Sequence, residues 1–205
     1  MGPSSPSSPA TGEETSHHQS LALGLLVRRL SDGRRRRVLD LGPAIGANVA
    51  FFASLSCRVH IADLHQSLFP PGGPRVRSEA RALEDILDRD LPPAEPFELI
   101  LTWDLFNYLE PKNIAAVAQR LKAFSQVGTS LLALISTRKE LPDRPTRFEV
   151  HDSQHLIYDV ESPLLRPAPR YKEPELSRAL AGFEVESSFL LRNGIQEYLF
   201  SYSGC

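Results

Sequence analysis

Short runs of apolar residues alternate along this chain with longer stretches in which apolar residues recur every three or four positions. The short runs are typical of buried strands, and the recurring pattern is typical of helices that bury one face. The pattern predicts strands at residues 37–41, 58–63, 98–103 and 129–136, and helices at 20–30, 46–55, 78–87 and 111–126. Strands that alternate with helices in this way indicate an α/β fold with a mostly parallel sheet.

The C-terminal end departs from this alternation. A helix is expected at 173–182, and two strand-like runs follow at 183–191 and 195–202. Arg192, Asn193 and Gly194 join the two runs, and an Asn-Gly pair favours a hairpin turn in which both residues adopt positive φ. A further strand is weakly marked at 74–78. We therefore expect a mostly parallel sheet that ends in an antiparallel hairpin.

Two segments lie outside the regular pattern. Residues 1–18 are rich in Ser and Pro and poor in apolar side chains, which predicts a disordered tail before a single domain at 19–205. His17 and His18 fall in this tail and are interpreted as solvated side chains. Residues 138–172 are polar and Pro-rich, and they are too long for a simple connection between two elements.

Composition narrows the classes of function. Hydrophobic residues make up 41% and charged residues 23% of the chain, as in an ordinary globular domain. A net charge of −2 gives no reason to expect nucleic acid or a membrane surface as the main partner. Cys57 and Cys205 follow no metal or disulfide spacing, and the sequence has neither the pattern of a signal peptide nor an apolar run of membrane length. These features predict a cytoplasmic protein.

Acidic residues and glycines meet where the first two strands are expected to end. Asp40 ends the first strand, Asp63 ends the second, and Gly42 and Gly46 bracket the turn that follows Asp40. In an open α/β sheet, ligands bind at the carboxyl ends of the strands. A carboxylate there can accept hydrogen bonds from both hydroxyls of a ribose, and a Gly-rich turn lets the backbone come close to a ligand. The sequence therefore predicts a nucleoside pocket.

The spacing of the glycines distinguishes between cofactors. The stretch from Asp40 to Gly46, "DLGPAIG", does not have the two-and-three glycine spacing of a dinucleotide-binding turn. It resembles the D-x-G-x-G-x-G motif of class I S-adenosylmethionine-dependent methyltransferases. The resemblance runs from Val38 to Tyr202, because "FELILTWDLFNYLEP" is similar to the fourth-strand segment of that family and the terminal Asn-Gly hairpin to its last two strands. It implies a Rossmann-like seven-stranded sheet with helices on both faces, S-adenosyl-L-methionine as cofactor, and methyl transfer.

The same resemblance implies a set of cofactor contacts. Ala44 stands where the motif has its middle glycine, directly after Pro43. This departure concerns the affinity for the cofactor more than the fold, and it leaves open a non-catalytic binding module built on the methyltransferase fold. The implied contacts are Asp40, Gly42, Ala44 and Gly46 in the turn, Asp63 at the ribose, Thr102 and Trp103 at the methionine end, and Glu84 or Asp85 near adenine.

The methyl acceptor is expected beyond the end of the fourth strand. Asp104, Asn107 and Tyr108 follow that strand and are the candidate catalytic residues, since an amine or hydroxyl acceptor needs a base. Insertions such as residues 138–172 often cover the acceptor site in this family. The candidate substrate contacts within this segment are His151, His155, Tyr158, Arg170 and Tyr171, with Arg166 beside them. No third ligand accompanies the two histidines, so no metal is expected, and the near-neutral charge favours a small-molecule acceptor over nucleic acid while protein acceptors stay open.

Overall fold

A six-stranded sheet forms the centre of the computed structural model, which describes residues 16–70, 80–91, 95–159 and 164–204. The strand order is β10-β11-β5-β4-β2-β3. The strands β2 (Arg36–Asp40), β3 (Cys57–Ile61), β4 (Phe97–Trp103) and β5 (Ser125–Ser136) are parallel, and β10 (Phe183–Leu190) and β11 (Ile195–Tyr202) are antiparallel to their neighbours. The seventh strand, expected at 74–78, lies outside the described residues.

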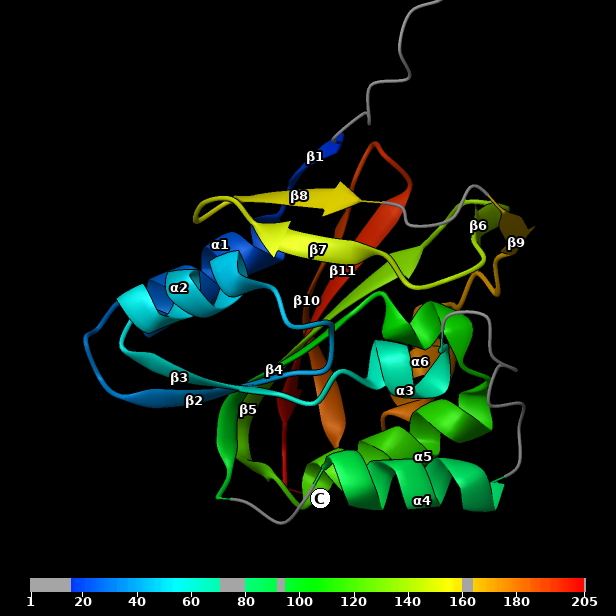
Figure 1. The fold of residues 1–205 in the computed structure, drawn as a ribbon, viewed down its shortest axis with the longest axis horizontal. Helices are drawn as coiled ribbons and strands as arrows, with labels where there is room; N and C mark the ends of the chain where they lie inside the picture. The colour runs from blue at the N-terminus through cyan, green and yellow to red at the C-terminus, as the bar shows by residue number, and fades with distance from the viewer. Residues whose placement is uncertain (1–15, 71–79, 92–94, 160–163, 205) are drawn as a thin grey trace, which may run out of the picture.

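Helices cover both faces of this sheet (Figure 1). On one face lie α1 (Leu21–Leu30) and α2 (Gly46–Ser54). On the other lie α3 (Leu64–Leu68), α4 (Ala80–Asp90), α5 (Pro111–Lys122) and α6 (Glu173–Ala179), together with the 3₁₀ turn η1 (Leu105–Tyr108). Strand residues alternate between the two cores: in β4, Leu99 and Leu101 pack on the first face and Ile100 on the second.

The ends of the parallel strands meet at one edge. Asp40 pairs with Ile61 of β3 and with Leu101 of β4, so β2 and β3 end side by side and β4 ends two residues later, at Trp103. This places the Gly-rich turn (residues 40–46), the start of α3 and the end of β4 next to one another. A nucleoside pocket would form at this edge.

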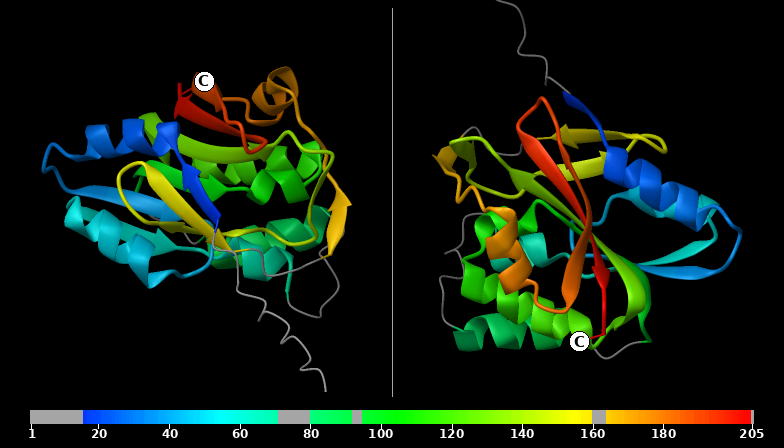
Figure 2. Two further views of the ribbon diagram at one scale, coloured as in Figure 1. Left: turned by 90° about the horizontal axis from the view of Figure 1, so that it is seen from above. Right: turned by 180° about the vertical axis from the view of Figure 1, so that it is seen from behind.

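A second, smaller sheet lies at the top of the molecule in Figure 1 and crosses over the main sheet in the view from above in Figure 2. We call it the cap sheet; it consists of β1 (Ser16–Gln19), β8 (His155–Asp159) and β7 (Arg147–Val150), all antiparallel. Asn48 of α2 fastens it, because its amide donates to the carbonyl of Phe148 and accepts from the N–H of Val150. A two-stranded sheet, β6 (Glu140–Pro142) with β9 (Leu165–Pro167), lies beside it.

Two sequence-based expectations differ from this structure. Residues 16–18 were assigned to a disordered tail but form β1, and His18 is buried, because β8 supplies backbone partners and Glu197 a polar one. In the turn between β10 and β11 only Gly194 has positive φ, at 81°, and its N–H donates to the carbonyl of Leu191. This is the geometry of a three-residue hairpin loop, in which a type I turn is followed by one glycine in the left-handed region; a two-residue loop would need positive φ at both Asn193 and Gly194.

Among the described residues, no helix has both the length and the apolar character needed to cross a membrane.

Candidate functional site

Asp40 closes β2 and is buried. Its Oδ1 atom accepts hydrogen bonds from the Gly42 N–H at 2.9 Å and from the Trp103 Nε1–H at 2.7 Å. Burial raises the pKa of Asp40 to about 6, and the two hydrogen bonds act in the opposite direction. The carboxyl group that the methyltransferase motif places beside the cofactor's amino group is therefore engaged by an indole of the same chain.

The three small residues of the Gly-rich turn differ in their surroundings. A Cβ at Gly42 would lie 2.6 Å from Cδ1 of Trp103, so only glycine fits there. Ala44 is exposed and is not among the residues with positive φ, so its methyl group causes no backbone strain. Gly46 begins α2, and a Cβ there would have no atom within 4 Å. The alanine in place of the middle glycine is therefore compatible with this turn.

Trp103 fills the space over Gly42. Its φ of 49° lies in the left-handed region, which costs a non-glycine residue about 1–2 kcal/mol, and the pairing of β4 with β5 is irregular at the same point. The indole stacks on Phe148 of β7, with ring centroids 5.8 Å apart and planes inclined by 11°. Phe148 of the cap sheet and the turn at Asp40 and Gly42 thus hold the indole in place from two sides.

Asp63 lies in a different environment. It has φ 34° and is the N-cap of α3, where its Oδ1 accepts from the Gln66 N–H at 3.0 Å. Its side chain is half-buried, and no described hydrogen bond uses Oδ2. It faces a small cavity of about 210 Å³. The lining residues are Pro43, Asp63, His65, Gln66, Phe69, Arg144, Pro145 and Arg147.

His65 is a member of this cavity that the sequence analysis missed. The ring is 8% exposed, and within the described ranges its Nε2 has no hydrogen-bond partner. Burial lowers the pKa of His65 to about 3, so the imidazole is neutral at physiological pH. Its position two residues after Asp63 was the one signal in the sequence. Glu84 and Asp85, the sequence candidates for the adenine contact, are exposed on α4 and line neither this cavity nor the larger one.

A large cavity of about 520 Å³ lies beyond the end of β4. The candidate catalytic residues Asp104, Asn107 and Tyr108 all line it. So do Leu134, Ser136, Arg138, Lys139, Glu140, Leu141, Pro142, Thr146, Phe148, Tyr158, Leu165, Gly194 and Ile195. The cavity therefore lies between η1, the end of β5, the segment from Arg138 to Phe148, and the turn before β11.

Of the three candidate catalytic side chains, Asp104 differs from the other two. The amide of Asn107 is fully used by backbone: it donates to the carbonyls of Asp104 and Leu134 and accepts from the Ser136 N–H. The hydroxyl of Tyr108 donates to the Arg144 carbonyl at 2.6 Å, and burial raises the pKa of that phenol. Both side chains shape the cavity and have no group to spare for a reaction.

Asp104 is 7% exposed, and only one of its oxygens is engaged by backbone: Oδ2 accepts from the Thr146 N–H at 3.0 Å. In the described part of the chain Oδ1 has no partner. Burial raises the pKa of Asp104 to about 7, against the smaller and opposite effect of the polar groups of Thr146 and Tyr108 beside it.

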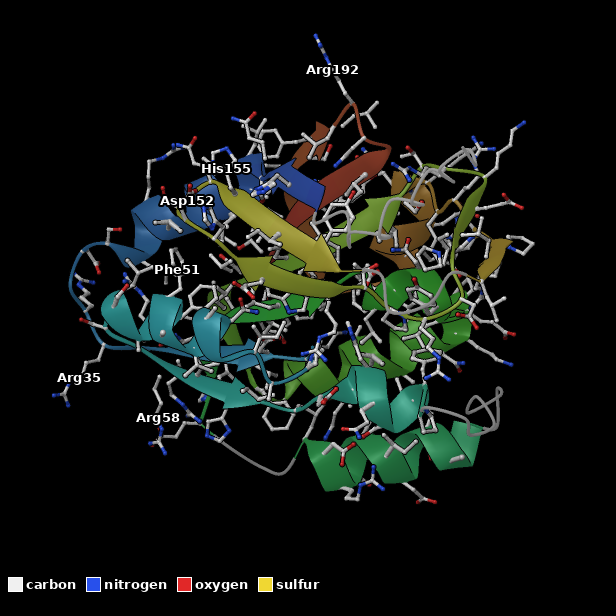
Figure 3. All side chains as sticks on the ribbon, turned by 45° about the horizontal axis from the view of Figure 1, so that its top comes forward. Arg35, Phe51, Arg58, Asp152, His155 and Arg192 are labelled. Carbon is white, nitrogen blue, oxygen red and sulfur yellow. The ribbon has the colours of Figure 1, made fainter. Side chains whose placement is uncertain are left out.

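The other sequence candidates lie in several places. Tyr158 lines the large cavity, whereas His151 and His155 lie at the turn between β7 and β8 and do not. His155 pairs there with Asp152, as Figure 3 shows beside α1. Tyr171 donates to the Leu109 carbonyl at 2.6 Å, and Arg170 is exposed. Thr102 is buried, and its hydroxyl donates to the Leu132 carbonyl. Arg166 lies over the ring of Tyr108.

Comparison with known proteins identifies the fold. No model of a protein family matches the sequence, and no curated protein matches it significantly. Solved structures do match: the PH0226 protein from Pyrococcus horikoshii OT3 is 12% identical, with a TM-score of 0.51 over 87% of this chain and 86% of that one. Structures of S-adenosylmethionine-dependent methyltransferases match as well, so this chain has the class I methyltransferase fold.

Two further structures of this fold were solved with cofactor molecules bound. The 1,6-didemethyltoxoflavin-N1-methyltransferase of Burkholderia thailandensis, with bound 1,6-didemethyltoxoflavin and S-adenosylhomocysteine, is 17% identical, with a TM-score of 0.50 over 89% of this chain and 79% of that one. Magnesium protoporphyrin IX methyltransferase of Synechocystis PCC 6803, with S-adenosylmethionine, is 12% identical, with a TM-score of 0.50 over 88% and 78%.

The residues present fit one half of S-adenosylmethionine directly. Asp63, with an oxygen unused by the described hydrogen bonds, fits the ribose, and the neutral His65 beside it fits a nucleoside. At the other half, Asp40 and the backbone of Gly42 fit an amino acid, but the Trp103 indole lies against both of them. The methionine half fits only when this indole turns away.

Proposed function

We propose that this chain is an S-adenosylmethionine-dependent methyltransferase that acts on a small-molecule acceptor. The observation that carries the proposal is the arrangement at one edge of the sheet: Asp40, Gly42 and Asp63 lie at or directly after the ends of two neighbouring parallel strands, and the large cavity lies beyond the next strand. When bound, S-adenosylmethionine supplies a methyl group already activated on sulfur, so the protein has to bind and align two molecules and exclude water.

Each part of the site has a role in this proposal. Asp63 accepts hydrogen bonds from the ribose hydroxyls, and His65 with Phe69 encloses the nucleoside. Asp40 pairs with the amino group of the methionine half. The acceptor occupies the large cavity, whose wall includes Asp104.

Trp103 sets the condition for binding. Its indole must leave Asp40 and Gly42 before the methionine half can enter, and the free energy needed for this movement lowers the apparent affinity. Because Phe148 of the cap sheet stacks on the same indole, the cap sheet has to shift or let the ring slide out.

The position of the Trp103 indole is also compatible with a second candidate function. If the indole stays bonded to Asp40, the chain is a non-catalytic binding module that keeps the methyltransferase fold and uses the large cavity alone. The Trp103–Asp40 hydrogen bond and the Trp103–Phe148 stack both stabilise this state.

A titration distinguishes the two candidates. Trp103 is the only tryptophan of the chain, so its fluorescence reports on the movement of the indole. S-adenosylmethionine and S-adenosylhomocysteine should bind in a calorimetric titration and should change the tryptophan emission. Trp103→Phe keeps a ring on Phe148 but removes the Nε1 donor, and it should bind about 10-fold more tightly, since a hydrogen bond to a charged group contributes roughly 1.5–3 kcal/mol.

The ribose assignment is tested in the same series. Asp63→Ala should weaken binding by about 10-fold to 100-fold, whereas Glu184→Ala, an exposed acid on β10, should leave it unchanged. Absence of binding by the parent at millimolar concentration, with binding restored in Trp103→Phe, would establish the non-catalytic module with a blocked pocket. Absence of binding by both proteins would end the methyltransferase proposal.

A further inference from the structure

The large cavity has the dimensions and walls of a ligand site. Its volume of about 520 Å³ falls in the range of roughly 300–1,000 Å³ that is typical of small-molecule pockets. Leu134, Leu141, Phe148 and Ile195 form apolar walls, and the rings of Phe148 and Tyr158 lie 5.9 Å apart along one side. An occupant therefore has a largely apolar body, and a flat ring suits the aromatic side.

The polar groups inside the cavity determine which functional group the ligand carries at the end of its apolar body. Asn107 and Tyr108 spend their side-chain hydrogen bonds on backbone groups, as described above. Asp104 is left with an enclosed oxygen that has no partner in the described ranges. A buried carboxyl group without partners is costly, and the cost falls when a donor reaches it.

We propose that the large cavity binds an organic amine with an apolar, ring-containing body, and that the amine donates a hydrogen bond to Asp104. This substrate class rests on the proposed function as far as the amine is the methyl acceptor; the binding itself does not depend on the cofactor. A carboxylic acid is excluded at this end, because its carboxylate would place a second anion beside Asp104. An alcohol is a weaker ligand than an amine here, because its hydroxyl offers one donor and no charge.

Asp104 also suits the proton transfer that such an acceptor requires. An ammonium ion has no lone pair until it releases a proton, and a general base holds that proton best when its own pKa is near neutral. Burial raises the pKa of Asp104 into that range. The proton therefore passes from the nitrogen to the Asp104 carboxylate, the N–H electron pair stays on nitrogen, and rotation about the C–N bond turns this lone pair away from Asp104 toward the methyl group.

The mouth of the cavity carries charges of both signs. Arg138, Lys139 and Glu140 line it and are exposed, and Arg138 is held by a hydrogen bond from its Nε to the Asn193 carbonyl. If Arg138 and Lys139 select the ligand, and Asp104 does not, the cavity prefers an acid. The two predictions are opposite and can be measured.

Three probes with the same phenyl body test the proposal: 2-phenylethylamine, 2-phenylethanol and 3-phenylpropionate. Each is titrated calorimetrically into the full chain at pH 8 without S-adenosylmethionine. The amine should bind at least 10-fold more tightly than the alcohol and the acid. Asp104→Asn should reduce this preference by at least 10-fold. Glu149→Gln, on the same strand as Phe148 but outside the cavity lining, should retain it.

Equal binding of the three probes by the parent would overturn the proposal, as would tighter binding of the acid or binding of none. So would an amine preference that persists in Asp104→Asn. Because no probe titration contains the cofactor, these outcomes are independent of whether S-adenosylmethionine binds. A protein that prefers the amine but binds no S-adenosylmethionine would keep this site and lose the proposed reaction.

Discussion

Asp40 and Asp104 are buried carboxyl groups at the ends of neighbouring strands, and burial raises the pKa of both, to about 6 and about 7. They differ in what holds them. Asp40 receives two donors on one oxygen, whereas Asp104 receives the Thr146 N–H on one oxygen and nothing described on the other. A group that binds its proton more tightly in the folded chain than in the unfolded chain destabilises the fold as the pH rises.

The upward shift of the Asp104 pKa gives a prediction for Asp104→Asn. The folded pKa is raised above the unfolded value, so stability falls as pH rises from the unfolded pKa, near 4, to about 7. The variant cannot ionise and should escape this loss. Relative to the parent, its free energy of unfolding should increase by about 2–4 kcal/mol between pH 4.5 and pH 8.

Urea unfolding of both proteins at the two pH values measures this change. Glu184→Gln removes an exposed acid from β10 and should follow the parent at both values. Parallel pH dependence of Asp104→Asn and the parent would mean that Asp104 does not titrate in this window.

At the scale of elements, the Gly-rich turn is determined by what packs over it. The methyltransferase motif has three glycines, but only Gly42 lies against another side chain, the Trp103 indole. Ala44 does not have positive φ, and a side chain at Gly46 would have room. The turn therefore depends on β4 and the cap sheet as much as on its own sequence.

Substitution by alanine at the two remaining glycines should give different results. Gly42→Ala places a methyl group 2.6 Å from the indole, so either the turn or Trp103 has to move, and the protein should lose about 1–3 kcal/mol of stability. Gly46→Ala is the matched control: its methyl group meets nothing within 4 Å, and alanine favours the start of α2. It should be neutral or stabilising in thermal unfolding. Equal melting temperatures for the two variants would show that the indole does not rest on Gly42.

Elements with a clear local pattern could be predicted from the sequence. Ile114, Val117 and Leu121 recur at helical spacing, and α5 buries all three, although it ends at Lys122 because β5 already begins at Ser125. Asp40 ends β2 as its apolar strand pattern predicts, whereas Asp63 lies two residues beyond the end of β3 and is the N-cap of α3. The three-stranded pairing of the cap sheet could not, since β1 has only four residues and its partner β8 lies far along the chain.

The side-chain partners in the site were harder to predict than the elements. Nothing in the sequence around Trp103 indicates that its indole turns to Asp40 or that Phe148 stacks on it. His65 and the unpartnered oxygen of Asp104 likewise depend on which groups the folded chain brings near them. The residue types of the site followed from the motif, whereas their availability for a ligand required the tertiary structure.

At the scale of the whole molecule, one buried hydrogen-bond network joins the N-terminal strand to the last strand of the main sheet. Glu197 of β11 is fully buried and accepts from His18 Nε2 and from the N–H of Ala22, both at 2.9 Å. The other ring nitrogen of His18 lies 2.6 Å from the amide nitrogen of Asn193. Through β1 and β8, this network also anchors the cap sheet that covers Trp103.

Two truncations test whether the network holds the molecule together. Removal of residues 1–15 deletes none of the described contacts and should leave the melting temperature nearly unchanged. Removal of residues 1–18 also deletes His18 and leaves the Glu197 carboxyl buried with one donor. Loss of one partner from a buried pair costs about 3–5 kcal/mol, which lowers the melting temperature of a chain of this size by about 6–20 °C.

His18→Ala in the full chain should reproduce most of this loss. The double variant His18→Ala/Glu197→Gln should lose less stability than the sum of the losses in the two single variants. A buried amide that lacks the His18 ring as a partner is less costly than a buried carboxylate that lacks it. If residues 1–18 can be deleted without a shift in melting temperature, contacts outside β1, such as those of Asn48 and the Trp103–Phe148 stack, are sufficient to hold the cap sheet, and its opening for a ligand would not involve β1.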